Sequence, residues 1–298
     1  MAETTTIEWA DKTWSPWEGC TKVSPACDNC YAEAMNRWLR GGENWGQGAP
    51  RREYSEAHWL KPLAWHNKAV KEGTRPKVFP SVMDPFDNEV MTERRLQFLR
   101  VVMRTPSLTW LLLTKRIGNV KRQLAETAAM ARSMPCEDEL ATWLAAWVDS
   151  RPPGNVWLGS TLANREEMLR DGPKLKATPA ALKFWSYEPA LGPMGKIPLD
   201  LMPDWVICGG ESGRNARPIS PDWARHLRDQ CDSAGVRFLF KQWGEWLPML
   251  GQAQGVQVTK KTITVDGWVM GWTGKKAAGR RLDGIEHNGI PTAGACSS

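Results

Sequence analysis

The chain has 298 residues, of which 42% are hydrophobic and 24% charged. These are the proportions of a globular protein with a large core, and they exclude a disordered or fibrous chain. Lys and Arg number 39 against 33 Asp and Glu, and this net charge of +6 does not by itself establish a nucleic-acid partner. No run of 18 apolar residues occurs and the N-terminal residues lack a signal-peptide pattern, so we expect a cytoplasmic protein with no membrane partner.

Short apolar or β-branched runs alternate along the chain with segments of helical periodicity. After a short strand before Cys20, the predicted order is helix 31–40, strand 77–80, helix 92–103, strand 108–114, helices 120–131 and 137–148, strand 155–159, helix 165–170, strands 182–186 and 205–209, helix 221–231 and strand 236–241. This alternation indicates βαβ units and a mainly parallel sheet. We therefore predict an α/β fold, a partial TIM-type (β/α) barrel, within residues 1–250.

Two segments depart from this alternation. Residues 41–62 are rich in Gly, Arg and Trp, and we expect an ordered loop there. Residues 251–298 alternate apolar and polar side chains around Asp266-Gly267, which is a hairpin signal, and they carry six Lys or Arg against three Asp or Glu. We predict a small C-terminal β-hairpin and a basic tail packed on the barrel.

Three of the seven cysteines, Cys20, Cys27 and Cys30, are clustered in the pattern C-x6-C-x2-C. An odd number of cysteines argues against a disulfide framework, whereas thiolates at this spacing can surround one soft ion or cluster. No His lies near them, so three cysteines on a [4Fe–4S] cluster would leave one iron open for a ligand. A zinc ion completed by a distant Cys or His, or unligated thiols, are the alternatives.

Beyond this loop, several motifs together resemble a phage-encoded radical S-adenosylmethionine (SAM)-like family, and more distantly spore photoproduct lyase, although the first cysteine gap is three residues longer than the commonest radical SAM spacing. The motifs are IEWADKTWSPWEGCTKVSPACDNCYAEA, FPSVMDPFDNEV, LLLTKR, VWLGSTLANRE, FWSYEPALGP, WVICGGESGRNARP, FKQWGEW and GKKAAGRRLDGIEHNGIP, within residues 7–291. The resemblance implies a radical SAM-type partial barrel, a [4Fe–4S] cluster on Cys20, Cys27 and Cys30, SAM, an electron donor such as a flavodoxin or ferredoxin, and the host cytoplasm as location.

Polar side chains at predicted strand ends are the candidate SAM ligands. Ser81 and Asp84 follow the second strand, where related enzymes place groups that face the SAM ammonium, although a capped turn before Pro85 explains them equally well. Ser160, Thr161 and Asn164 resemble contacts to the SAM ribose, or they cap the following helix. The remaining candidate cofactor residue is Tyr31, directly after Cys30.

Candidate catalytic residues also follow strands. Lys115 and Arg116 end the apolar run TWLLLTKR and are placed to pair with a carboxylate in a barrel mouth, or they are a solvated strand end. Glu188 and Glu211 follow consecutive strands. Cys208 either donates a hydrogen atom, a task that a thiol performs in spore photoproduct lyase, or is a small buried residue.

A third group of candidate residues is assigned to substrate binding. Its members are Arg214, Arg217, Lys241, Gln242 and Trp243.

The substrate hypothesis is a nucleic-acid base. Basic, Trp-rich loops stack on bases and contact phosphates, although the 18 tryptophans of this chain are also explained by a large core. The resemblance implies modification or rearrangement of a thymidine derivative in phage DNA. Two alternatives stay open: a zinc-stapled nucleic-acid-binding protein without catalysis, and a hydrolase that uses Glu188 and Glu211 as acid and base.

Overall fold

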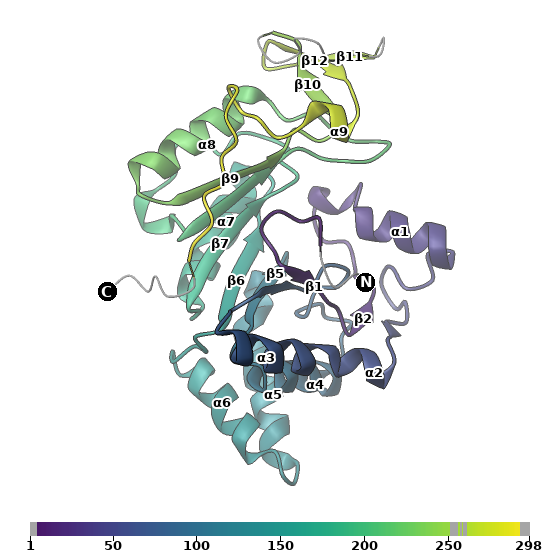
Figure 1. The fold of residues 1–298 in the computed structure, drawn as a ribbon, viewed down its shortest axis with the longest axis vertical. Helices are drawn as coiled ribbons and strands as arrows, with labels where there is room; N and C mark the ends of the chain where they lie inside the picture. The colour runs from purple at the N-terminus through teal and green to yellow at the C-terminus, as the bar shows by residue number, and fades with distance from the viewer. Residues whose placement is uncertain (1–4, 251–255, 257, 259–260, 293–298) are drawn as a thin grey trace.

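The centre of the protein is a curled, seven-stranded sheet whose strands are all parallel, in the order β1-β4-β5-β6-β7-β8-β9 (Figure 1). The computed structural model describes residues 5–250, 256, 258 and 261–292. The strands are β1 (Lys12–Thr13), β4 (Lys77–Phe79), β5 (Thr109–Thr114), β6 (Val156–Thr161), β7 (Leu182–Tyr187), β8 (Trp205–Gly209) and β9 (Arg237–Gln242). The α/β half-barrel predicted from the alternation of strands and helices is therefore present.

Helices lie on the outside of the curled sheet (Figure 1). They are α3 (Lys61–Glu72), α4 (Thr92–Met103), α5 (Val120–Ser133), α6 (Asp138–Val148), α7 (Arg165–Ala177) and α8 (Pro221–Ser233). Figure 1 places α1 (Tyr31–Arg40) on the other side, across from the sheet. Short 3-10 turns complete the connections: η1 (Pro25–Cys27), η2 (Ile117–Asn119) and η3 (Leu199–Leu201).

Two separate apolar clusters cover the two faces of the sheet, because successive side chains of a strand point to opposite faces. In β8, Val206 and Cys208 belong to the larger cluster with the helices, whereas Trp205 and Ile207 belong to the smaller cluster on the inner face. The N-terminal segment fills this inner face with Trp9, which is 2% exposed. The inner face of the half-barrel is thus a packed core.

Three smaller units are attached to the half-barrel. β2 (Trp17–Glu18) pairs with β3 (Arg52–Glu53), and α2 (Glu56–Trp59) follows them. A three-stranded sheet has the order β10 (Trp246–Pro248), β12 (Trp268–Trp272) and β11 (Thr262–Val265), and α9 (Lys275–Ala278) comes next. The chain then returns along β9, where Asn288 forms an antiparallel bridge with Leu239.

The predicted strands and helices agree with the observed ones to within a few residues, except that helix 165–170 extends to Ala177. The hairpin at Asp266-Gly267 is also present, and both turn residues have positive φ angles. The predicted loop at 41–62 contains β3, α2 and the start of α3, and β10 from the predicted barrel region joins the C-terminal sheet. Residues 251–255, 257, 259–260 and 293–298 of the predicted C-terminal unit lie outside the described residues.

Among the residues that the structure describes, no helix is long and apolar enough to cross a membrane.

Candidate functional site

A cavity of about 570 Å³ lies at the carboxyl end of the sheet. Parallel strands end at one edge, so the inward-facing residues that follow them meet there. The strand-end side chains that line the cavity are Ser81, Asp84, Lys115, Thr161, Ser186, Glu188, Lys241 and Gln242. Residues that lie far apart in the sequence therefore share one polar wall.

The cysteine loop forms the facing wall, since Cys20, Cys27 and Cys30 all line the same cavity. The loop starts at Gly19, whose φ of +129° and close approach to the carbonyl of Asn44 exclude a side chain. It ends at Cys30, the N-cap residue of α1. All six described cysteines are free thiols.

The chemistry of these donors fits an iron–sulfur cluster, which is held by cysteine thiolates. Three thiols from one short loop line a cavity; among the residues described, all three are free of disulfides and no His lines that cavity. Within the described part of the chain, no group of three or more His, Cys, Asp or Glu side chains is already arranged to hold a metal ion. Binding a cluster would therefore require the loop to bring its thiols together.

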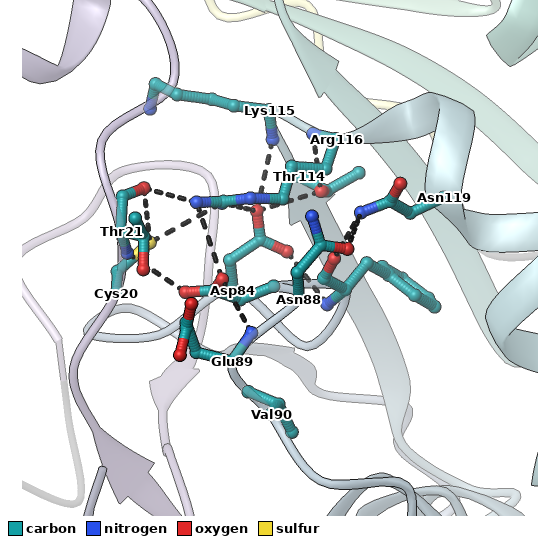
Figure 2. A network of polar contacts seen from close by, with 12 residues as sticks. Cys20, Thr21, Asp84, Asn88, Glu89, Val90, Thr114, Lys115, Arg116 and Asn119 are labelled. Carbon is teal, nitrogen blue, oxygen red and sulfur yellow. Dashed lines mark hydrogen bonds and ion pairs between the residues drawn. The ribbon is translucent and has the colours of Figure 1, made fainter. Parts of the chain in front are cut away.

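Arg116, the second residue after β5, connects the Cys20 end of the loop to the sheet (Figure 2). Its Nη1 donates to Cys20 Sγ at 3.6 Å and to Asp84 Oδ2 at 2.9 Å, and its Nη2 donates to the carbonyl of Thr21. Burial, and next the Asp84 carboxylate, raise the pKa of the Cys20 thiol to about 12. At neutral pH the Cys20 side chain is therefore a protonated, neutral thiol.

Glu211 and Arg217 hold the other end of the loop. Arg217 Nη2 donates to Glu211 Oε1 at 2.6 Å and to the carbonyl of Pro25 at 2.8 Å, and Asn29 Nδ2 donates to Glu211 Oε2 at 2.9 Å. Burial would raise the pKa of Glu211, but hydrogen bonds from Arg217 and Asn29 outweigh burial and lower it. Both residues, expected to act on substrate, are engaged in fixing the cysteine loop.

Glu188 and Lys241 form an ion pair in the cavity wall, with 2.7 Å between Oε1 and Nζ and side chains that are each 17% exposed. Gln242 Nε2 donates to the same oxygen at 3.2 Å. Lys115 differs from these residues, because its ammonium has no ion-pair partner among the residues described, and Figure 2 shows its side chain extending away from Asp84 and Arg116. Lys115 thus remains available for an anionic ligand group.

Tyr31 lines the cavity from the start of α1, and its hydroxyl donates to the carbonyl of Ser81 at 2.7 Å. Burial, and next the charge of Cys30, raise the pKa of this phenol above its ordinary value. The hydrogen bond joins the cysteine segment to the end of β4.

Six predicted site residues do not line the cavity, and one of them is Arg217, which holds the cysteine loop. Ser160 and Cys208 are 0% exposed, and strand alternation turns both toward the outer face, where Cys208 packs in the core with the helices. Burial raises the pKa of Cys208 well above its ordinary value. Neither group reaches a ligand in the cavity, so hydrogen-atom donation by Cys208 does not fit this placement.

The other three residues outside the cavity have different environments. Asn164 caps α7, where its Oδ1 accepts a hydrogen bond from the amide of Glu167 at 2.9 Å. Trp243 is fully buried and donates to the carbonyl of Arg281. Arg214 is exposed. For Asn164 the helix-capping alternative is the one observed.

Sequence reasoning missed Thr21, Arg51 and Asp87, which also hold the cysteine loop. Thr21 is bound on three sides: its amide donates to Asp87 Oδ2 at 2.9 Å, and its hydroxyl and carbonyl accept from Arg51 and Arg116. The signal for Asp87 was a second aspartate three residues after Asp84. Their roles depend on contacts over more than 25 residues of sequence.

The model of the family described as "Protein of unknown function (DUF5131)" matches residues 4–291. No curated protein and no solved structure matches the chain. The match covers both the half-barrel and most of the C-terminal unit.

Proposed function

We propose that this chain, which belongs to the DUF5131 family, is a radical SAM enzyme that modifies or rearranges a nucleic-acid base. In this proposal Cys20, Cys27 and Cys30 hold a [4Fe–4S] cluster, and the cavity beside them binds SAM and the substrate. The observation that carries it is that three free thiols of one loop line the same cavity as the polar ends of five strands. When bound, the cluster and SAM supply a carbon-centred radical that abstracts a hydrogen atom from the substrate.

Lys115 is suited to bind the SAM carboxylate. Its ammonium lies at the cavity, half-buried, with no carboxylate partner within the described ranges. The neighbouring acid, Asp84, is engaged by Arg116 and by the Thr114 hydroxyl at 2.9 Å, and so does not neutralise the lysine. A charge-assisted hydrogen bond to a carboxylate is among the stronger polar contacts that a protein makes.

Hydroxyl groups and an aromatic ring supply the remaining contacts for SAM. Thr161 and Ser81 face the cavity from the ends of β6 and β4, and hydroxyls both donate to and accept from ribose oxygens. Tyr31, fixed through its hydroxyl, presents its ring beside Cys30 for stacking on a base. Ser160 and Asn164 have no role here, because one faces the outer core and the other caps a helix.

The ion pair of Glu188 with Lys241 is proposed to orient the substrate. Both groups line the cavity, and the carboxylate keeps one oxygen that does not bond to Lys241 or Gln242. That oxygen can accept a hydrogen bond from a hydroxyl or an imino group of the substrate. The lysine holds the carboxylate in place.

The packed inner face excludes water from below the site. Trp9 lies between Phe79 and Trp205, with ring centroids 4.5 and 6.1 Å away, and Leu113 adds apolar surface to the cavity. A dry floor limits side reactions of a reactive intermediate with solvent and stray hydrogen donors.

A nucleic-acid substrate is supported by the outer surface of α1. Tyr31 and Met35 line the cavity, and the same helix continues outward with Trp38, which is 83% exposed. Arg37 and Arg40 in its last turn add positive charge beside the indole. An exposed aromatic ring among arginines is a stacking platform for a base, continuous with the cavity. The thymidine derivative in phage DNA remains the specific form of this proposal.

The test is anaerobic purification, reconstitution with iron and sulfide, and electron paramagnetic resonance with and without SAM. We expect a reduced [4Fe–4S] signal that SAM perturbs, and its loss in Cys27→Ala. The matched control is Cys136→Ala, because Cys136 is an exposed thiol that does not line the cavity. Zinc in place of iron would contradict the proposal and would favour a metal-stapled binding protein.

A further inference from the structure

We infer that Arg116 is a positioning residue that sets the reduction potential of the cluster by placing a buried positive charge and a hydrogen bond at Cys20. This inference rests on the proposed function, because it assigns a role toward the cluster held by the cysteine loop. The Arg116 side chain is buried, with 6% of it exposed, so its charge is shielded from solvent.

The geometry ties one guanidinium to both the loop and the sheet. Figure 2 shows Arg116 between Cys20 and Thr21 on one side and Asp84 on the other. Nη1 lies 3.6 Å from Cys20 Sγ and 2.9 Å from Asp84 Oδ2, so the sulfur and the carboxylate share one donor group. A planar guanidinium presents several fixed donors at once, which a lysine does not.

Buried charges are concentrated at the Cys20 end of the loop. Arg116 lies within 3.6 Å of Asp84 and Asp87, and Arg51 lies 3.0 Å from Asp87, with all four side chains at most 9% exposed. Neutralising Arg116 removes one positive charge from beside the sulfur, in a region where screening by water is weak.

Reduction adds an electron to an iron–sulfur cluster, so a nearby positive charge and hydrogen bonds to a ligating sulfur favour the reduced state. Arg116 supplies both to Cys20. Neutralising it should make the potential more negative, whereas neutralising Asp84 should make it more positive. Opposite shifts of the reduction potential in the two variants would indicate an effect of charge. Loosening of the loop alone would shift both potentials in the same direction.

The experiment is a redox titration of the reconstituted protein without SAM, followed by electron paramagnetic resonance, for Arg116→Gln and Asp84→Asn. The control is Arg100→Gln, which removes the two hydrogen bonds from Arg100 of α4 to the Glu137 carboxylate, because Arg100 does not line the cavity. We expect a more negative potential for Arg116→Gln, a more positive one for Asp84→Asn, and no shift for the control. Equal potentials in Arg116→Gln and the control would overturn the inference, as would shifts of the same sign in both test variants.

If Arg116→Gln does not fold, Arg116→Lys replaces it, since a lysine keeps the positive charge but lacks the several fixed hydrogen-bond donors of the guanidinium. Its potential should lie below that of the unmodified protein, and a value equal to or above it would overturn the inference. Failure of the proposed function is distinguishable, because the unmodified protein would then hold no iron–sulfur cluster. A cluster with an unshifted potential in the variants would refute only the role of Arg116.

Discussion

Arg217 and Glu211 form a bidentate ion pair at the end of the cysteine loop, in which Arg217 Nε donates to Glu211 Oε2 at 2.9 Å and Nη2 donates to Oε1 at 2.6 Å. The same guanidinium reaches the carbonyl of Pro25, so a residue after β8 fixes the loop more than 190 positions earlier in the chain. With Arg116 at the Cys20 end, each end of the loop is held by an arginine that pairs with a carboxylate. This arrangement determines where the three thiols lie.

Glu211→Gln should lower the free energy of unfolding by about 2 kcal/mol at neutral pH, because it leaves Arg217 without its charged partner. The pKa of Glu211 in the folded protein lies below its ordinary value of 4.5. The carboxylate therefore contributes stability that is complete above that value and is lost as the pH falls through the lower folded pKa. Urea unfolding at pH 7 and below about pH 4 measures the free energy of unfolding of the unmodified protein and of Glu211→Gln. The difference between the two proteins should be smaller at the lower pH. A difference that stays constant with pH would contradict the assignment.

Lys115→Met should weaken SAM binding about tenfold or more, because a charged hydrogen bond to the carboxylate contributes about 1.5–3 kcal/mol. Anaerobic calorimetry on the cluster-loaded protein measures the affinity. Lys121→Met is the matched control, since Lys121 is an exposed lysine on the next helix and does not line the cavity. Equal affinities for the two variants would show that Lys115 does not contact SAM.

Trp38→Ala should weaken binding of single-stranded DNA about tenfold, because stacking of one base on an aromatic ring contributes about 1–3 kcal/mol. Fluorescence anisotropy with a labelled oligonucleotide measures this affinity, without any need for a cluster. Leu199→Ala is the control, since Leu199 is 76% exposed and does not line the cavity. Unchanged binding in Trp38→Ala would remove α1 as the nucleic-acid surface.

A further variant at that surface tests the charge. Arg40→Gln should reduce the slope of log affinity against log salt by about 1, if Arg40 contacts a phosphate. An unchanged slope would mean that Arg40 makes no such contact.

Gly159→Ala should destabilise the protein by about 1–3 kcal/mol through overpacking of the inner core. A Cβ on Gly159 would lie 2.3 Å from the ring of Phe184, which is itself fully buried. Gly154→Ala is the control, because a Cβ there meets nothing within 4 Å. Thermal unfolding should therefore give a lower midpoint for Gly159→Ala than for Gly154→Ala. Equal midpoints would show that the core adjusts at no cost.

Local sequence pattern determined the elements of the fold. Apolar runs such as 108–114, alternating with helical periodicity, are sufficient to predict β5 and its neighbours, because both signals depend on residues only a few positions apart. The Asp266-Gly267 turn was predicted for the same reason. The close spacing of Cys20, Cys27 and Cys30 likewise placed the three thiols at one cavity.

Tertiary structure alone decided what each strand-end residue does. Strand alternation and the curl of the sheet turn Glu188 into the cavity and Cys208 toward the helices, although one follows β7 and the other lies near the end of the neighbouring β8. Arg116 lies 96 residues from Cys20 in the chain and yet contacts its sulfur. Such pairings are set by packing between distant elements, a property that no local pattern in the sequence encodes.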